Sequence, residues 1–356
     1  MPPGSGVAVV AFARTPHVPV ADTTTNGTEM LVPLLREVYD ATGATKADID
    51  FWCSGSSDYL AGRAFSFISA VDAIGAWPPI NESHVEMDAA WALYEAWVKI
   101  LTGQVRTALV YGFGKSSAGQ LRRVLALQHD PYSVAPLWPD SVSVAGLQAR
   151  LGLEAGRWTE RDMAEVAARS RAAAQEDPTA QARSGPVDVE ALLATEPVAD
   201  PLRAHDIAPI TDGASVIVLA SAERAREFAE RPAWITGIEH RIESGALGAR
   251  DLTRSPSTEA AGRALGHIGA FQVAELHAPF THQEIILAEA LGLGSGVVVN
   301  PSGGPLAGNP MFAGGLNRIG EAARRIFSGQ ADRVLAHAAS GPLLQQNLVA
   351  SMEVEV

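Results

Sequence analysis

One pattern occurs twice along this chain of 356 residues, and it limits the folds that the chain can adopt. Leu-Thr-Gly-Gln at 101–104 precedes the apolar run 107–111, and Phe-Ser-Gly-Gln at 327–330 precedes the apolar run 333–337. In both places a long helical pattern leads through a Gly-Gln turn into a short buried strand, at the same spacing. We interpret this match as a duplication. Duplicated β/α units predict two similar, parallel-rich sheets packed through shared helices, which is a layered α/β fold.

The periodicity of the remaining chain agrees with this class. Apolar and β-branched runs predict strands, and apolar positions at helical spacing predict helices. Strands are expected at 6–12, 49–53, 84–87, 107–111, 214–220, 234–239, 273–277, 296–300 and 333–337, and helices at 28–42, 89–102, 159–176, 221–229, 257–266, 281–291 and 315–327. Asn26 or Thr28 is expected to cap the first helix, and Thr281 and Glu284 have the spacing of a capping box.

Residues 118–205 interrupt this alternation. They contain Pro131, Pro136 and Pro139, then a helical pattern, then a polar stretch. We expect an inserted loop domain that forms a lid over the functional site. The chain then divides into an N-terminal half, residues 1–231, which carries the insertion, and a C-terminal half, residues 232–356.

The composition excludes several classes of function. The chain has 27 basic and 40 acidic residues, a formal net charge of −13, which disfavours nucleic acid as a partner because phosphate binding needs a basic face. No long apolar run predicts a membrane span, and the N-terminus lacks a signal-peptide pattern, so a cytoplasmic protein is expected. Cys53 is the single cysteine, which excludes a disulfide framework, a zinc–cysteine cluster and any mechanism with two thiols. No metal site is expected.

Motifs in the second half resemble a known family. Asn-Pro-Ser-Gly-Gly at 300–304, Gly-Asn-Pro at 308–310 and Ala-Gly-Gly-Leu at 313–316 resemble the C-terminal signature of the thiolase superfamily. Ile-Thr-Asp-Gly-Ala at 210–214 resembles its mid-chain signature. Glu-Leu-His-Ala-Pro-Phe at 275–280 resembles the histidine-bearing version found in sterol-carrier-protein thiolases and bacterial "lipid-transfer" thiolase-like proteins.

The resemblance covers nearly the whole chain and carries several expectations. It implies a duplicated five-layered αβαβα fold with the insertion in the first half. It also implies coenzyme A thioesters as substrates, no covalently bound cofactor, and a homodimeric or heteromeric assembly.

The chain departs from the family at the family's catalytic positions. Asp88 stands where the nucleophilic cysteine of a thiolase begins the long first-half helix, and the second catalytic cysteine falls at about Ala338. The usual Gly-His-Pro triplet reads Gly-Asn-Pro at 308–310. Cys53 lies elsewhere, at the end of an early strand. Chemistry through an acyl-cysteine therefore lacks its nucleophile, so ordinary thiolase activity is not expected.

An oxyanion site remains possible without a thiol. His277 and Asn309 can both donate hydrogen bonds to the enolate of an acyl-CoA. Such an enolate forms in retro-aldol cleavage of a 3-hydroxyacyl thioester. The chain resembles bacterial aldolases that shorten steroid side chains, which have a thiolase fold, lack the cysteine and use a small OB-fold/zinc-ribbon partner. This resemblance implies a carbon–carbon lyase as the leading function.

Three residues are candidates for the base, and every candidate has a structural alternative. Tyr59 lies in a polar loop, Asp88 at the nucleophile position and His337 at the end of the last predicted strand. Tyr59 could instead pack at an interface, Asp88 could cap the long helix, and His337 could be a core histidine. The alternative for His277 is also a core histidine, and the alternative for Asn309 is a turn.

Small residues complete the predicted site. Gly303 and Gly304 allow close approach of the backbone, either to coenzyme A or to a packed helix. Ser340 and Gly341 follow the last predicted strand and are expected to help bind coenzyme A. Phosphate groups could be bound locally by arginines, despite the net charge, at Arg122, Arg123 or Arg150.

Two other functions stay open. The first is a catalytically silent subunit that binds acyl-CoA or lipid and completes a heteromer with a second thiolase-like subunit, because each substituted position removes a catalytic group. The second is a degenerate acyltransferase that uses another nucleophile, such as Ser340.

Overall fold

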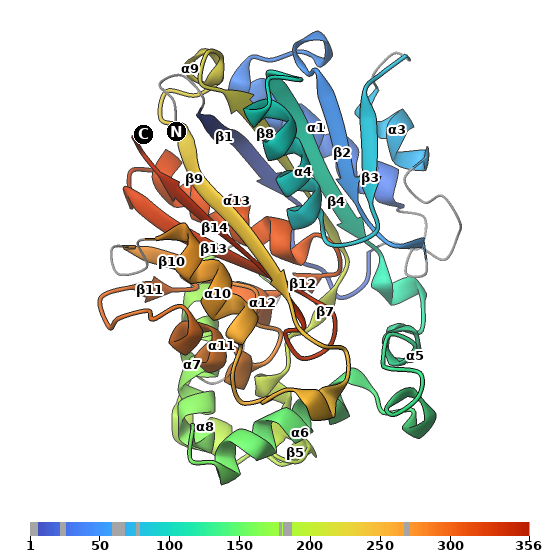
Figure 1. The fold of residues 1–356 in the computed structure, drawn as a ribbon, viewed down its shortest axis with the longest axis vertical. Coiled ribbons are helices and arrows are strands. Elements are labelled where there is room, and N and C mark those ends of the chain that lie inside the picture. The colour runs from blue at the N-terminus through green and yellow to red at the C-terminus, as the bar shows by residue number, and fades with distance from the viewer. Residues whose placement is uncertain are drawn as a thin grey trace.

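The computed structural model describes residues 6–21, 26–58, 68–75, 79–177, 180, 187–266 and 271–355. Within these residues, ten strands form one mixed sheet with helices on both faces (Figure 1). The strands of the sheet are β1 (Val7–Arg14), β2 (Phe51–Gly55), β3 (Glu82–Val85), β4 (Thr107–Gly114), β8 (Gly213–Ser221), β9 (Ala233–Ile242), β10 (Val273–Leu276), β11 (Val298–Val299), β13 (Arg333–Ser340) and β14 (Gln346–Glu353).

The helices fall into two groups. Those that belong to the duplicated core are α1 (Gly27–Thr42), α3 (Ile68–Ile74), α4 (Ala89–Leu101), α9 (Ala225–Phe228), α10 (Pro256–Leu265), α11 (Thr281–Ala290), α12 (Gly304–Ala307) and α13 (Gly314–Phe327). The segment between β4 and β8 holds α5 (Leu121–Ala126), α6 (Ser141–Glu154), α7 (Glu160–Glu176) and α8 (Val189–Leu193). Short strands outside the main sheet are β5 (Pro197–Ala199), β6 (Leu202–Arg203), β7 (Ile210–Thr211) and β12 (Asn309–Pro310), and 3-10 turns lie at Lys46–Asp48, Ser116–Ala118, Ala135–Leu137, Ala204–Asp206 and Leu247–Ala249.

The sheet repeats one strand order. The first half of the chain contributes β3-β2-β4-β8-β1 and the second contributes β11-β10-β13-β14-β9, which is the same order with the same parallel and antiparallel pairings. An antiparallel pairing of β1 with β9 joins the two sets. The predicted duplication is therefore confirmed. The predicted division at residue 231 falls in the segment between α9 and β9.

The repeated Gly-Gln turns are the same structure in both halves. Gly103 and Gly329 each have a φ of +71°, in the left-handed region that favours glycine. The following Gln104 and Gln330 donate their N–H groups back to helix carbonyls at 3.0 and 2.9 Å. Each turn thus ends its helix, α4 or α13, as a glycine C-cap and points the chain into the next strand.

Alternating side chains build the layers on either side of the sheet. In β1, Val7 and Val9 face a central core shared with α4 and α13, whereas Ala8 and Val10 face the core under α1. The third core lies under α10 and α11, on the far face of the second-half strands. Both five-stranded halves of the sheet pack on α4 and α13, so the layers run from α1 through the first-half strands, α4 with α13, and the second-half strands to α10 with α11. These are the five layers predicted for this chain.

The insertion packs mainly on the second half. Side chains of α6 share a core with β10 and α11, and α7 contacts α11 and α12. Figure 1 shows α6, α7 and α8 below the strands β10 and β11. No helix in the described part of the chain is long and apolar enough to cross a membrane.

Local sequence signals were partly right. Asn26 caps α1 and forms a capping box with Glu29. The capping box predicted for Thr281 and Glu284 is wrong. The Thr281 hydroxyl instead donates to Asp206 at 2.7 Å, and Glu284 pairs with Arg169 and Asn300. The helix predicted at 221–229 is shortened to α9. The strand β14 was not predicted, because it begins with polar residues and its apolar part is short.

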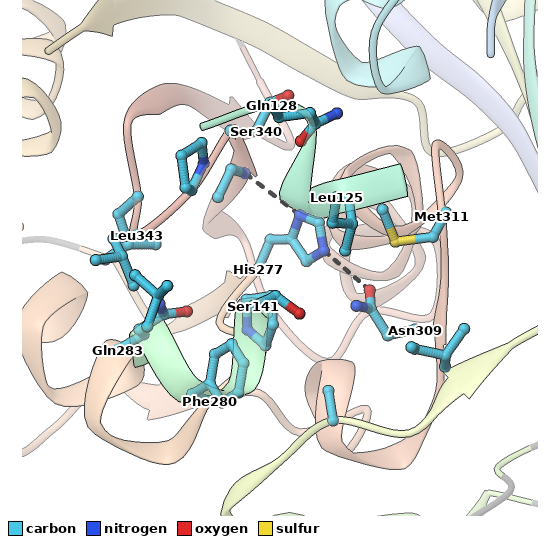
Figure 2. Close-up of a pocket in the computed structure, with 18 of the residues that line it drawn as sticks. Leu125, Gln128, Ser141, His277, Phe280, Gln283, Asn309, Met311, Ser340 and Leu343 are labelled. Carbon is cyan, nitrogen blue, oxygen red and sulfur yellow. Dashed lines mark hydrogen bonds between the residues drawn. The ribbon is translucent and has the colours of Figure 1, made fainter. Parts of the chain in front are cut away.

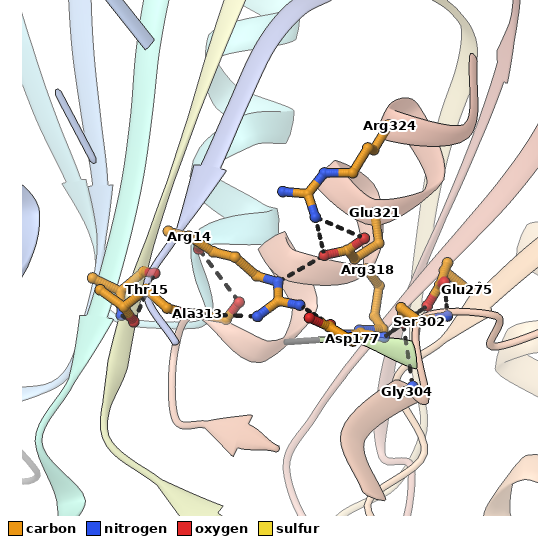
Figure 3. A network of polar contacts seen from close by, with 12 residues as sticks. Arg14, Thr15, Asp177, Glu275, Ser302, Gly304, Ala313, Arg318, Glu321 and Arg324 are labelled. Atoms are coloured by element: carbon orange, nitrogen blue, oxygen red, sulfur yellow. Dashed lines mark hydrogen bonds and ion pairs between the residues drawn. The ribbon is translucent and has the colours of Figure 1, made fainter. Parts of the chain in front are cut away.

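A buried ion network ties the insertion and both halves together (Figure 3). Arg14 on β1 pairs with Glu321 on α13 at 2.7 Å and with Asp177, just after α7, at 2.5 Å. Arg318 on α13 pairs with Glu275 on β10 at 2.6 Å, and both side chains are buried. Burial opposes ionisation of Glu321, but Arg14 and Arg324 outweigh it and lower the pKa of this carboxyl.

Candidate active site

A pocket of about 190 Å³ lies where the insertion meets both halves of the core. For scale, a cavity of roughly 150 Å³ holds a benzene molecule. Its walls come from α5, α6 and the segments that follow β10, β12 and β13. Most lining side chains are apolar, and the polar ones are Asp88, Gln128, His129, Ser141, His277, Gln283, Asn309 and Ser340.

His277 and Asn309 lie together in this pocket (Figure 2). The Ala339 backbone N–H donates to Nδ1 of His277 at 3.3 Å, so Nδ1 must be the unprotonated nitrogen of the ring. The proton is therefore on Nε2, which donates to Oδ1 of Asn309 at 3.0 Å. This bond turns the Asn309 oxygen toward the histidine and leaves the amide Nδ2 to donate to a ligand.

The charge state of His277 follows from its burial. The side chain follows β10 directly and is 8% exposed. Burial lowers the pKa of His277, and the Asp88 carboxylate and the Asn309 hydrogen bond only partly oppose this shift. His277 is thus a neutral donor at neutral pH that fixes the orientation of Asn309.

Asp88 caps two helices at once. One carboxylate oxygen accepts from the N–H groups of Ala90 at 2.9 Å and Leu316 at 3.0 Å, and the other accepts from Gly315 at 2.9 Å. A Cβ at Gly315 would lie 2.6 Å from the carboxylate, so this approach needs glycine. The predicted cap of α4 is confirmed, and the same side chain also accepts from the first turn of α13. Asp88 also lines the pocket, but these three donors already engage it as an acceptor.

The other two base candidates are not brought to the pocket. His337 is fully buried in β13, where Nε2 bonds to Oδ1 of Asn347 at 2.9 Å, and burial lowers its pKa to about 3. It does not line the pocket, so the structure places it as a core histidine. Tyr59 lies outside the described residues.

The small residues separate into two groups. Gly303 and Gly304 do not line the pocket. A Cβ at Gly303 would lie 3.2 Å from that of Ala174 on α7, so this turn allows close packing of a helix, the second of the two alternatives. Ser340 and Gly341 do line the pocket, beside His277.

The single thiol is remote from this chemistry. Cys53 is fully buried in β2 within the central core, and its Sγ lies 3.8 Å from the Glu95 carboxylate. Burial raises the pKa of the Cys53 thiol, which keeps it protonated. In the described part of the chain no cluster of three His, Cys, Asp or Glu side chains could hold a metal ion.

The insertion supplies part of the pocket. Leu125, Gln128 and His129 come from α5 and the turn after it, and Ser141 begins α6. Beside them, exposed Arg122 and Arg123 line a second hollow with Trp138 and Asp140, where Arg122 pairs with Asp140 at 3.3 Å. Arg150 is paired with Asp200. His129 and Gln283 were missed from sequence. Neither lies in a motif, and only the tertiary fold gathers these segments.

Sequence comparisons reach only part of the chain. No family model matches. An acetyl-CoA acetyltransferase of Methanothermobacter thermautotrophicus is 33% identical over 159 residues, which is 38% of this chain and 42% of that protein. The benzoylsuccinyl-CoA thiolase subunit BbsB of Thauera aromatica is 28% identical over 192 residues, 47% of this chain and 50% of that protein. The matched stretch thus spans half or less of each of these relatives.

Comparison with solved structures covers the whole chain. Acetyl-CoA acetyltransferase of Bacillus anthracis superimposes with a TM-score of 0.80 at 18% identity, over 98% of both chains. A structure titled Ltp2-ChsH2(DUF35) aldolase gives 0.79 at 19% identity, over 99% of both chains. Human mitochondrial 3-ketoacyl-CoA thiolase gives 0.79 at 16%, also over 99% of both. The chain therefore has the thiolase fold, as its motifs predicted. Proteins of this fold include thiolases and an aldolase, so the reaction must be argued from the site.

Proposed function

We propose that this protein processes acyl-CoA thioesters and cleaves a carbon–carbon bond of a bulky 3-hydroxyacyl-CoA by a retro-aldol reaction. The observation that carries the proposal is the fixed pair in the pocket. Neutral His277 holds Asn309 so that the amide Nδ2 can donate to a thioester oxygen. No thiol lines the same pocket.

The chemistry needs stabilisation of an enolate. When the bond between C2 and C3 breaks, negative charge develops on the thioester oxygen. A preoriented donor in an apolar pocket stabilises such charge strongly, and removal of one donor in comparable sites lowers kcat by about 10²–10³-fold. In this proposal Asn309 is that donor, and His277 is the residue that positions it.

Acyl transfer through a covalent thioester is less well supported, although the curated relatives include acetyl-CoA acetyltransferases. Cys53 is buried in the core and Asp88 is engaged by three backbone donors. Ser340 lines the pocket, but no histidine or carboxylate is seen hydrogen-bonded to its hydroxyl in the described structure. A lyase needs none of these nucleophiles.

The substrate we propose is apolar and large. Leu125, Phe280, Met311 and Leu343 line the pocket, so it favours a hydrocarbon group such as a steroid side chain. The cavity accommodates the reacting carbons, and the rest of a ring system would extend through its mouth. Arg122 and Arg123 are the groups proposed for the phosphates of coenzyme A.

We further propose an OB-fold/zinc-ribbon partner on a homodimeric core. The segment between α5 and α6 exposes Tyr132 (91%), Leu137 (78%) and Trp138 (52%) beside the pocket. Aromatic residues exposed in this way are typical of protein interfaces. The structurally similar Ltp2-ChsH2(DUF35) aldolase has the same fold, and its name gives two components. Changing Tyr132 and Trp138 to serine should abolish co-purification with such a partner.

The direct test is a product assay. The purified protein, with and without the partner, is incubated with the 3-hydroxyacyl-CoA of a steroid acid, and products are followed by mass spectrometry. We expect a ketone and a short acyl-CoA, without added free coenzyme A. Absence of both products under both conditions would refute the lyase.

A silent subunit is the second candidate, and one observation favours it. Asp88 and the Nε2–H of His277 are both satisfied by internal hydrogen bonds. A silent subunit would bind acyl-CoA, turn nothing over, and co-purify with a cysteine-bearing thiolase subunit. The product assay and a pull-down together separate the two functions.

A further inference from the structure

The loop between β13 and β14 forms one wall of the pocket and has an unusual backbone. Pro342, Leu343 and Leu344 all line the pocket, and Leu343 is seen in Figure 2. Leu343 has a φ of +54° and Leu344 a φ of +57°, both in the left-handed region. A bulky side chain at such a φ is rare and costly. The loop is therefore strained at two successive residues of the pocket wall.

The turn between the two strands does not explain leucine at these positions. Turns that need a positive φ at successive residues normally use glycine, asparagine or aspartate. Among the described residues, five that are not glycine have a positive φ, and three of these, Phe312, Leu343 and Leu344, line the pocket. Strain of this kind persists only where the surrounding structure enforces it, and it concentrates at ligand sites. The groups that enforce it are therefore candidates for a role in the site.

Two side chains hold this backbone from outside the pocket. Arg250, in the segment between β9 and α10, donates from its guanidinium to the carbonyls of Pro342 at 3.3 Å and Leu343 at 3.2 Å. The Asn347 amide Nδ2 donates to the Leu344 carbonyl at 2.8 Å. Neither Arg250 nor Asn347 lines the pocket. Three successive carbonyls of the loop are thus held by groups that do not contact the pocket space.

The Arg250 guanidinium has few other partners in the described structure. Its side chain is 6% exposed, and its ion-pair partner Glu243 lies 4.0 Å away. Glu243 is itself engaged by the Ser257 hydroxyl, which donates to it at 2.5 Å. The Arg250 Nε makes no hydrogen bond with a described residue. A buried charge is costly unless it is paired or hydrogen-bonded, and the carbonyls of the loop are the closest acceptors that this charge has.

We propose that Arg250 is a positioning residue that clamps the loop, so that Leu343 and Leu344 form a fixed wall against the acyl group of the substrate. This inference rests on the proposed binding of acyl-CoA in the pocket. The clamp opposes the relaxation that the strained backbone favours, so the wall is formed before the ligand binds. A preformed apolar wall binds a bulky hydrocarbon without the cost of ordering the loop. The clamp therefore acts on the acyl part of the affinity and not on the affinity for free coenzyme A.

Binding of a steroid thioester and of free coenzyme A separates this role from a general structural one. Arg250→Met keeps the apolar stem and removes the donors. Affinity falls with the fraction of molecules in which the wall is formed, so we expect cholyl-CoA to bind about tenfold more weakly if about one molecule in ten keeps the wall. Isothermal titration calorimetry should show this loss with unchanged binding of free coenzyme A. Arg250→Lys, which keeps a charged donor, should recover part of the affinity.

The chain offers a matched control for the loss of a buried contact. Arg231 also donates to a backbone carbonyl, that of Ile326 at 2.7 Å, and does not line the pocket. Arg231→Met should therefore bind cholyl-CoA and free coenzyme A as the wild type does. An equal loss of both affinities in Arg250→Met would overturn the inference, because a wall against the acyl group does not predict it.

A second variant keeps the test decisive if Arg250→Met does not fold. Leu343→Gly removes a side chain of the wall, and glycine tolerates the left-handed φ, so cholyl-CoA should again bind more weakly and free coenzyme A as before. Unchanged cholyl-CoA affinity in either folded variant would overturn the inference. If cholyl-CoA binding responds to Arg250→Met but the product assay gives no cleavage, the lyase fails and the clamp stands. Cleavage with unchanged affinity gives the reverse, and failure of the wild type to bind cholyl-CoA would overturn both.

Discussion

Asn309 and His277 act as a pair in which one side chain sets the direction of the other. The backbone N–H of Ala339 fixes the histidine tautomer, and the histidine fixes the amide. The sequence could identify both residues, because they stand in recognisable motifs. It could not show which one keeps a donor free of internal hydrogen bonds, because that depends on a hydrogen bond from a strand about sixty residues away.

The first prediction concerns the Asn309 amide. Asn309→Asp replaces the Nδ2 donor with an oxygen of nearly the same size. We expect kcat for retro-aldol cleavage to fall by about 10²–10³-fold, because the enolate loses a donor and meets a negative charge. Asn81→Asp, on an exposed residue, is the control. An Asn309→Asp enzyme with normal kcat would remove Asn309 from the reaction.

The second prediction concerns Asp88 as a double cap. Loss of a helix cap costs about 0.5–2 kcal/mol, so Asp88→Ala should lower the free energy of unfolding by about 1–4 kcal/mol. Asp140→Ala is the matched comparison, because Asp140 caps only α6 and should cost about half as much. Urea denaturation measures both. Equal losses in the two variants would contradict the shared cap.

At the scale of elements, periodicity and turn chemistry determine most of what is observed. The strands of the main sheet, except β14, and the long core helices follow from apolar spacing, and the Gly-Gln turns follow from the repeat. The failures come from tertiary contacts. The Thr281 hydroxyl donates to Asp206 rather than bonding within its own helix. Glu284 pairs with Arg169 and accepts a hydrogen bond from Asn300. Neither partner is near in sequence.

The third prediction tests the ion pair that joins β10 to α13. Arg318→Met leaves the fully buried Glu275 carboxylate without its cation. Breaking a buried pair in this way costs about 3–5 kcal/mol of stability, whereas replacing both partners with apolar residues costs far less. Urea denaturation should therefore show a large loss for Arg318→Met and recovery in the double variant with Glu275→Leu. Arg263→Met, in an exposed pair with Glu259, should change stability by less than about 1 kcal/mol.

At the scale of the molecule, duplication explains the fold but not the pocket. The repeated strand order makes the layers, and it was visible in the sequence. The pocket forms where the insertion lies against both halves, so its residues come from segments far apart in the chain. His129 belongs to no motif, which is why sequence reasoning could not find it.

The fourth prediction concerns the pH dependence of stability. Burial lowers the pKa of His17, His282 and His337 to about 3, whereas an unfolded histidine has a pKa of about 6.5. The unfolded chain therefore binds more protons below pH 6.5, so stability is present above that pH and is lost as the pH falls toward 3. Well below pH 6.5 the three residues contribute a slope of roughly 4 kcal/mol per pH unit.

Denaturation by urea at pH 7.5, 6.5 and 5.5 checks this slope. Buried Glu275 and Glu284 have raised pKa values, which act in the opposite direction, so the comparison between variants is the sharper readout. His337→Gln should reduce the dependence of the unfolding free energy on pH by the contribution of one histidine proton. An identical slope in the variant would contradict a neutral, buried His337.

The central claim is that this thiolase fold makes an enolate without a thiol, and cleavage in deuterium oxide tests it most directly. Wild-type protein, with the partner present, is incubated with a 3-hydroxyacyl-CoA in deuterium oxide without free coenzyme A. The deuterium content of the short acyl-CoA is then measured by mass spectrometry. A retro-aldol reaction predicts one deuterium at C2 and an equimolar ketone, with both products formed about 10²–10³-fold more slowly in Asn309→Asp. Failure of the 3-hydroxyacyl-CoA to react, together with cleavage of a 3-ketoacyl-CoA only when free coenzyme A is added, would contradict the account.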